Sequence, residues 1–160
     1  DHYVFVAITY TKLNTLRTRL FSNLKGKGYR FANYISPHAY LDEETEIGEN
    51  VFIFENNTIQ PFVKIRDNCI LWSGNHIGHH SLIEDNVFIS SHVVISGFCK
   101  IGKNSFLGVN STIINGVSIG EKNLIAEGTI ISSNTEKDSI YKSSESKRSK
   151  VSASKFFKLK

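Results

Sequence analysis

A six-residue period governs most of the chain and constrains its fold more than any other feature. From Leu41 to Ile131, sixteen positions spaced by six are all Leu or Ile, with no insertion. The residue two places before each of them is mostly small or β-branched. The residue three places after is Asn or Gly at nine of the fifteen positions from 44 to 128. Because Asn and Gly tolerate left-handed backbone, each six-residue unit predicts a short strand followed by a tight corner.

This period predicts a parallel β-helix. An α-helix would need apolar residues about 3.6 positions apart, whereas a hexapeptide repeat is typical of a β-helix. Three units make one 18-residue coil of a triangular prism. We therefore expect residues 39–132 to form an all-β, left-handed parallel β-helix of about five coils. Cys69 and Cys99 fall in the inward column of small residues, where we expect core packing rather than a reactive thiol.

The two ends of the chain lack the repeat. Residues 3–8 predict a buried strand, residues 11–24 an amphipathic helix with a leucine-rich stripe, and residues 29–36 another strand. We expect residues 1–38 to be the C-terminal part of an α/β domain. A chain that starts at Asp1 and contains no methionine is expected to be a fragment. Residues 133–160 read as a basic Ser/Lys-rich tail, partly disordered from about residue 143.

One outer face of the predicted prism is apolar. The residue before each inward aliphatic position points outward, and every third one falls on the same face. That face carries Phe52, Ile70, Phe88, Phe106 and Leu124. An exposed apolar column usually marks an interface, so it predicts a homotrimer formed through this face. The alternative is that residues 1–38 or the tail fold back and cover the column.

The charge distribution excludes some classes of partner. The formal net charge is +4, but residues 133–160 hold eight Lys or Arg against three acids, so the remainder is close to neutral. A basic tail does not indicate nucleic-acid binding, which would need a basic body. No apolar run approaches the ~18 residues of a membrane span, and two cysteines are too few for a disulfide framework. We expect a cytoplasmic protein.

Histidines cluster in the middle of the repeat. Four of the six lie within seventeen positions: His76, His79, His80 and His92. His80 and His92 occupy the Asn/Gly corner column, where a plain corner role is the alternative to a functional one. His76 points out of the second face. A zinc site is the sharpest alternative, but no Cys or acid joins these histidines at metal-ligand spacing, so we expect no metal.

His79 is the strongest catalytic candidate from its position in the repeat. It begins the corner that follows the outward His76. The residues one coil before and after it are Pro61 and Gly97, which leave the site open on one side. An accessible imidazole beside a shallow groove is a suitable general base near neutral pH.

The chain resembles the hexapeptide-repeat sugar acyltransferases, a group that includes sialic acid O-acetyltransferases and N-acetyltransferases of bacterial 4-amino sugars. The resemblance extends over residues 3–142. It is carried by Phe-Val-Ala-Ile at 5–8, Gly-Tyr-x-Phe at 28–31, Ile-Ser-Pro at 35–37, the block from 71 to 97, and Phe-Leu-Gly-Val-Asn at 106–110.

This resemblance implies a function and a site. It implies acetyl transfer from acetyl-CoA, the co-substrate, to a nucleotide-linked amino sugar in cell-surface glycan biosynthesis, with a groove between subunits of a trimer and an α/β domain that helps bind the sugar nucleotide. His79 matches the family's general base, and Gly97 the glycine whose N–H holds the thioester carbonyl. We group the other expected acetyl-CoA contacts as Gly108, Val109 and Gly128. The residues expected to bind substrate or orient the base are His76, His80, Asn75 and His92.

The sequence departs from the family at two places. His80 stands where relatives often have a carboxylate that orients the base. Residues 141–147 lack the Gly and Pro of the Tyr-x-Gly-x-Pro-Ala-Lys segment that cradles the CoA adenine in many relatives. Two other functions stay open: sugar O-acetylation, and a structural β-helix without catalysis, which the unbroken coils would suit.

Overall fold

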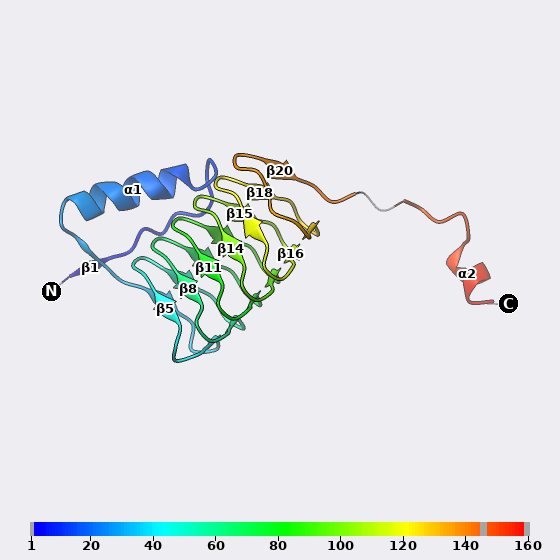
Figure 1. Cartoon of the computed structure of the whole chain (residues 1–160), viewed down its shortest axis with the longest axis horizontal. Helices are drawn as coiled ribbons and strands as arrows, with labels where there is room; N and C mark the ends of the chain where they lie inside the picture. The colour runs from blue at the N-terminus through cyan, green and yellow to red at the C-terminus, as the bar shows by residue number, and fades with distance from the viewer. Residues whose placement is uncertain (1, 145–146, 159–160) are drawn as a thin grey trace.

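The chain folds into a parallel β-helix with a helix lying along one edge (Figure 1). The computed structural model describes residues 2–144 and 147–158. The coils stack into three sheets and make about six turns, one more than the repeat predicts. All strand pairs are parallel, and from β6 to β18 the paired residues are 18 apart, as in Phe52 with Ile70. The predicted β-helix is therefore confirmed.

Each sheet is a ladder of two-residue strands. The seven-stranded sheet contains β3 (Tyr34–Ile35), β6 (Phe52–Ile53), β9 (Ile70–Leu71), β12 (Phe88–Ile89), β15 (Phe106–Leu107), β18 (Leu124–Ile125) and β20 (Ile140–Tyr141). The six-stranded sheet contains β4 (Tyr40–Leu41), β7 (Thr58–Ile59), β10 (His76–Ile77), β13 (Val94–Ile95), β16 (Thr112–Ile113) and β19 (Ile130–Ile131). The five-stranded sheet contains β5 (Glu46–Ile47), β8 (Lys64–Ile65), β11 (Leu82–Ile83), β14 (Lys100–Ile101) and β17 (Ser118–Ile119).

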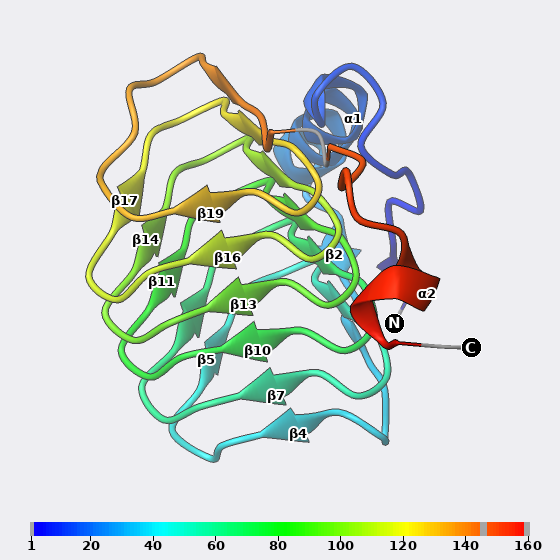
Figure 2. The same ribbon diagram turned by 90° about the vertical axis from the view of Figure 1, so that its right-hand side faces the viewer.

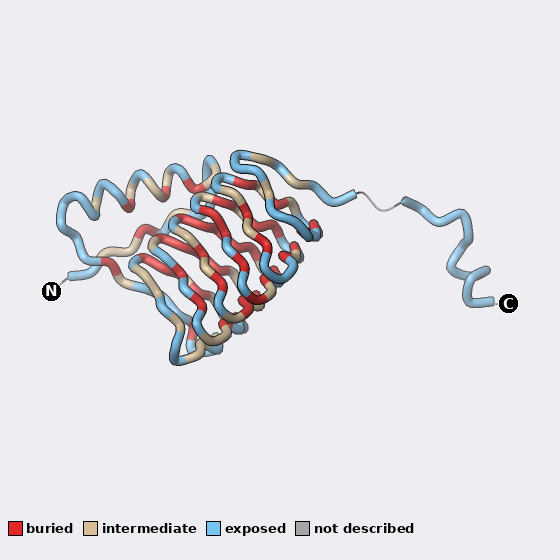
Figure 3. The backbone as a smooth tube through the Cα atoms, in the orientation of Figure 1, coloured by how far each residue is buried: buried red, intermediate tan, exposed pale blue. Residues whose placement is uncertain are grey.

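The aliphatic column fills the prism, as the repeat predicts. Of its sixteen members, fourteen are buried, and Leu41 and Ile47 are partly buried against them. Figure 3 shows these buried positions as a regular series along the coils. Cys69 and Cys99 lie in the same core, and burial raises the pKa of the Cys69 thiol to about 12. Both thiols are therefore core residues that stay protonated at neutral pH.

Three corners separate the sheets, and each contains a residue in the left-handed conformation. The first corner (residues 72–75 and their repeats) joins the seven- to the six-stranded sheet, the second (78–81) joins the six- to the five-stranded sheet, and the third (84–87) leads back. The predicted Asn/Gly column supplies these residues, with φ between 56° and 75°. Asn110 and Gly128 serve in the first corner, Gly116 in the second and Asn86 in the third.

A ladder of asparagines stabilises the third corner. The Nδ2 of Asn50 donates to Oδ1 of Asn68 at 2.8 Å, and the Nδ2 of Asn68 donates to Oδ1 of Asn86 at 2.7 Å. All three side chains are buried. Helix α1 (Thr15–Gly26) runs along this corner. Figure 2, which faces the ladder of strands from β4 to β19, shows the helix nearly end-on beside the coils.

Hydrogen bonds from Arg17 hold the helix against this ladder. The guanidinium is fully buried and donates to the carbonyl oxygens of Asn68, Asn86, Val87 and Thr9 at 3.0–3.3 Å. Burial lowers its pKa to about 10, so Arg17 stays charged at neutral pH. The predicted leucine stripe is half-buried, whereas Arg17 and Phe21 are the buried residues of α1. The C-terminal half of the predicted stripe does pack, since Leu20 and Leu24 contact the small core that contains Phe21, whereas the N-terminal half of the helix is held by a cation that backbone carbonyls satisfy.

The N-terminal segment forms a small second core. Strand β1 (Tyr3–Val4) pairs in parallel with β2 (Arg30–Phe31), and Val6, Phe21 and Phe31 pack together beside them. The helix begins at Thr15 rather than at residue 11, because residues 12–14 all have positive φ.

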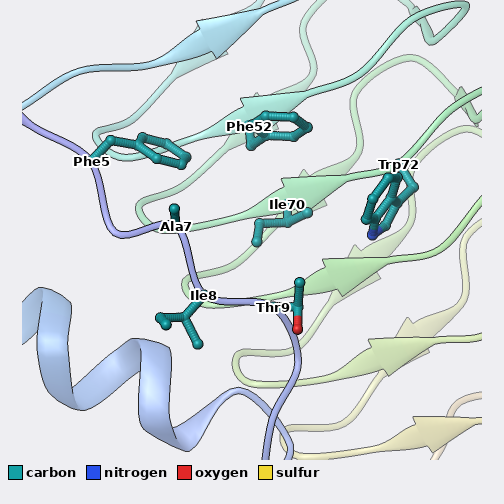
Figure 4. A pocket seen from close by; sticks show the side chains of 7 residues that line it. All are labelled: Phe5, Ala7, Ile8, Thr9, Phe52, Ile70 and Trp72. Carbon is teal, nitrogen blue, oxygen red and sulfur yellow. The ribbon is translucent and has the colours of Figure 1, made fainter.

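This segment covers the apolar column, so the expectation that the column is an exposed subunit interface is wrong. Ile70 is 7% and Phe88 1% exposed. The ring of Tyr10 packs edge-on against Phe88 and Phe106, with centroids 5.0 Å apart in each pair. Residues 5–9 cross this face, as Figure 4 shows. They leave an apolar cavity of about 190 Å³ that Ile70 helps to line. The open alternative, that residues 1–38 fold over this face, is what the structure has.

The basic tail makes few contacts with the coil. Its described residues from 147 to 158 are exposed, including the short helix α2 (Ala153–Phe156), and they extend away from the solenoid in Figure 3. Of the helices in the described residues, neither is long and apolar enough to cross a membrane.

Candidate functional site

Two imidazoles lie in contact at the second corner, directly after β10. The Nδ1 atoms of His79 and His80 are 3.1 Å apart, and the two rings are perpendicular. His79 is half-buried and His80 is exposed. The corner holds His79 in place because its backbone N–H donates to Oε1 of Gln60 at 2.9 Å.

The other edge of the His79 ring lies over Gly97, one coil further on. A Cβ built on Gly97 would stand 2.8 Å from Nε2 of His79 and 3.2 Å from Oδ1 of Asn115. Only glycine leaves room for the imidazole at this distance. No hydrogen bond of the described residues uses the Gly97 N–H. The second corner thus combines a free backbone donor, an amide oxygen and an imidazole nitrogen.

Aromatic rings surround His80. Phe62, His80 and Phe98 follow one another at 18-residue spacing, all with φ near +58°. The His80 ring stacks on Phe98 with centroids 4.9 Å apart and tilts against Phe62 at 4.7 Å. Phe98 also meets His79 edge-on at 4.9 Å. Phe62 and Phe98 are 45% and 57% exposed, so this ring column faces outward.

The first corner carries a second group of expected site residues. Gly108, Val109 and Gly128 line a surface cavity of about 600 Å³ together with Tyr10 and Glu127. His92 belongs to the same corner, where its ring packs over Gly74 of the coil before. This corner lies at the opposite edge of the six-stranded sheet from His79. Within one chain the structure therefore does not bring the expected acetyl-CoA contacts, Gly97 apart, to the imidazole.

His76 and Asn75 lie between the two groups. His76 is half-buried on the outer face of the six-stranded sheet, in register with Thr58 and Val94. Asn75 is 1% exposed, and its amide accepts from the N–H of Val93 and donates to the carbonyl of Trp72. Its side chain is thus part of the corner itself.

The sequence analysis did not identify four residues that lie near His79: Gln60, Phe62, Phe98 and Asn115. Steps of 18 from His79 lead to Asn115, and the same steps from His80 lead to Phe62 and Phe98, so the repeat contained the signal for three of them. Across the described residues, no group of three or more His, Cys, Asp or Glu is placed to hold a metal ion.

A parallel β-helix built from a six-residue repeat is typical of the hexapeptide-repeat proteins. Residues 44–79, 62–97 and 98–133 match the model of the bacterial transferase hexapeptide family (six repeats). The chain belongs to this family. No curated protein sequence matches it.

Several solved structures are similar. PerB from Caulobacter crescentus, solved with CoA and GDP-perosamine, is 25% identical with a TM-score of 0.81 over 85% of this chain. The acetyltransferase domain of PglB from Neisseria gonorrhoeae is 20% identical with a TM-score of 0.82 over 86% of this chain. WeeI from Acinetobacter baumannii is 20% identical with a TM-score of 0.80 over 88% of this chain. The chain spans 64% of the PerB chain, 66% of the PglB domain and 68% of WeeI.

Proposed function

We propose that the protein transfers an acetyl group from acetyl-CoA to the amine of a nucleotide-linked amino sugar, in cell-surface glycan biosynthesis. The observation that carries the proposal is the second corner, where Nε2 of His79 faces Gly97 and the Gly97 N–H has no partner among the described residues. Membership of the hexapeptide transferase family supports acyl transfer. The similarity to PerB, which binds CoA and GDP-perosamine, supports the co-substrate and the class of acceptor.

The reaction follows from this geometry. The amine attacks the thioester carbonyl, the new C–N bond forms, and the carbonyl oxygen gains negative charge that the Gly97 N–H stabilises. The proton lost by the nitrogen passes to Nε2 of His79, the general base. The C–S bond then breaks, and the proton moves on to the thiolate of CoA. No metal takes part in this scheme.

A homotrimer would complete the site. In a head-to-tail ring, one edge of the six-stranded sheet in one subunit faces the other edge in the next subunit. This arrangement would bring the first-corner group (Gly108, Val109, Gly128 and His92) toward the partner's second corner. Exposed apolar side chains along this sheet support it, since Val94 is 41% and Ile130 69% exposed. Light scattering of the full chain tests the ring, and a monomeric mass at micromolar concentration would exclude it.

We assign the parts of the chain accordingly. Residues 39–132 form the acyltransferase domain, residues 1–38 the C-terminal part of a sugar-nucleotide-binding domain, and residues 133–160 a basic tail. We propose that His76, on the outer face beside the second corner, contacts the acceptor sugar. Sugar O-acetylation is the second candidate, because the same base and oxyanion donor would serve a hydroxyl.

Thiol release from acetyl-CoA tests the function. Nucleotide-linked amino sugars and their hydroxyl counterparts are offered to the full chain, and the product is identified by mass. We expect amide formation matched by thiol release, and none with Gly97→Ala, whose Cβ would collide with His79. An ester product would establish O-acetylation instead. Failure of every acceptor to release thiol above the rate of the Gly97→Ala protein would contradict the proposal.

A further inference from the structure

The geometry points to His80 as the positioning residue that fixes the tautomer of His79. This inference rests on the proposed function, in which His79 is the base.

The contact between the two imidazoles determines where their protons lie. Two Nδ1 atoms 3.1 Å apart form a hydrogen bond when one carries a proton and the other a lone pair. His79 can act as a base at Nε2 when its own proton is on Nδ1. Nδ1 of His79 then donates to Nδ1 of His80, which keeps its proton on Nε2. In this arrangement the bare Nε2 of His79 faces Gly97.

The surroundings hold the His80 ring in the orientation that this hydrogen bond needs. Phe62 and Phe98 flank the ring on the coils before and after it, with centroid separations of 4.7 and 4.9 Å. Phe98 also abuts His79 edge-on, so the same ring contacts both imidazoles. All three members of this column adopt φ of 57–60°, which is rare for bulky residues. Left-handed backbone strain of this kind clusters at functional sites.

A histidine acceptor behaves differently from a carboxylate in acid. When His80 gains a proton, its Nδ1 becomes a donor, and Nδ1 of His79 must accept. The single proton of His79 then lies on Nε2, where it blocks the base. The groups that face the pair are the rings of Phe62 and Phe98, Gly97, and the amide of Gln60. In the described part of the chain, no carboxylate, Lys or Arg forms a hydrogen bond or ion pair with either imidazole. One proton taken up by the pair is therefore enough to block the base at Nε2 of His79.

Two variants separate the hydrogen bond from the packing. His80→Phe keeps a ring in the stack but removes the acceptor. His80→Asn places an amide oxygen near the position of Nδ1, accepts the same hydrogen bond, and suits left-handed backbone. The tautomer of His79 is read from the nitrogen chemical shifts of labelled histidine in the full chain, a measurement that needs no substrate.

We expect the His79 proton on Nδ1 in the wild type and in His80→Asn, and mainly on Nε2 in His80→Phe. Turnover should fall about 10–100-fold in His80→Phe, the range for removing a group that orients a functional histidine, with the KM for acetyl-CoA unchanged. His80→Asn should retain turnover within a few-fold.

An unchanged His79 tautomer in His80→Phe would overturn the inference, whatever the activity. So would equal turnover in His80→Phe and His80→Asn. The expected tautomers in a wild-type protein that acetylates no acceptor would support the hydrogen bond and contradict the proposed function alone, so the two failures are distinguishable.

Discussion

Two corners of the same solenoid share one backbone conformation but use it differently. In the third corner, three successive left-handed positions are Asn50, Asn68 and Asn86, whose amides bond to one another under helix α1. In the second corner, three successive left-handed positions are Phe62, His80 and Phe98, whose rings pack against one another. The asparagines Asn50 and Asn68 are fully buried, whereas both phenylalanines are about half exposed.

We interpret this difference as one between a structural edge and the edge that carries the proposed site. Asparagine suits left-handed backbone, and in a buried ladder its amide satisfies its neighbours, so the third corner lowers the free energy of the fold. Aromatic rings gain no such advantage at an exposed corner. The second corner nevertheless contains these rings. It is also the corner that carries His79 and the Gly97 N–H, which has no hydrogen-bond partner among the described residues. Strained backbone at the second corner and satisfied hydrogen bonds at the third corner therefore support placing the chemistry at the second corner.

The largest effect should come from His79→Ala at the second corner. Loss of the general base should lower turnover by ~10²–10⁴, because Nε2 is the proton acceptor. The KM for acetyl-CoA should stay within a few-fold and the melting temperature nearly constant, since this side chain is only half-buried. Steady-state kinetics on the full chain check this, with His38→Ala, an exposed histidine at a first corner, as the matched control. If His79→Ala keeps more than about a tenth of the activity while His76→Ala, His80→Ala or His92→Ala is dead, then another histidine is the base.

Asn68→Phe at the third corner should prevent stable folding. It removes a buried amide that accepts from Asn50 and donates to Asn86, and it forces a ring under α1. Overpacking and unsatisfied partners together should cost at least about 4 kcal/mol. Chemical denaturation followed by circular dichroism measures the loss. A stable Asn68→Phe protein would mean that the third corner tolerates rings as the second does.

Much of this comparison between corners could be predicted from the sequence, because each coil of the solenoid repeats the local geometry of the coil before it. The six-residue period gives the inward aliphatic column, and the Asn/Gly column gives the left-handed corners. Position in the period also places His79 beside Gly97. Each of these inferences depends on local geometry that repeats from coil to coil.

The packing of the N-terminal segment could not be predicted in this way. Arg17 donates hydrogen bonds to backbone carbonyls of the third corner, and a hydropathy pattern cannot predict such contacts. The apolar column that the sequence predicts to be an exposed interface is instead covered by Tyr10 and its neighbours. The proposed arrangement of the site across subunits would depend on contacts between chains, which a repeat within one chain does not encode.

Arg17→Met should destabilise the protein without affecting the second corner. The methionine keeps the length of the side chain but leaves the carbonyls of Asn68, Asn86 and Val87 without their donor. We expect a loss of about 3 kcal/mol, since hydrogen bonds to charged groups contribute more than neutral ones. The melting temperature should fall by about 6–12 °C, while turnover below the transition stays normal. A fall in turnover at low temperature would show that α1 and the second corner are coupled.

Phe98→Asn is the opposite of Asn68→Phe, because it places an asparagine in the second corner. It should hardly change stability. Asparagine is better suited to the left-handed backbone there, and the lost ring is 57% exposed. The free energy of unfolding should change by less than about 0.5 kcal/mol, as for most surface substitutions. Turnover should nevertheless fall, because Phe98 packs against both imidazoles. A large loss of stability would show that the ring column supports the solenoid as the asparagine ladder does.

The smallest effect should come from removing the tail. Truncation after Lys142 keeps β20, whose Tyr141 packs against the core, and deletes residues that are exposed wherever the structure describes them. The tail contains few apolar residues, so it cannot bury enough surface to offset the conformational entropy of ordering it. The melting temperature should therefore stay within about 2 °C of the full chain. A fall of more than about 5 °C, on the order of 1 kcal/mol, would mean that Phe156 and Phe157 pack against another surface, and the exposed faces of the six-stranded sheet and its second corner would then be the first places to look for it.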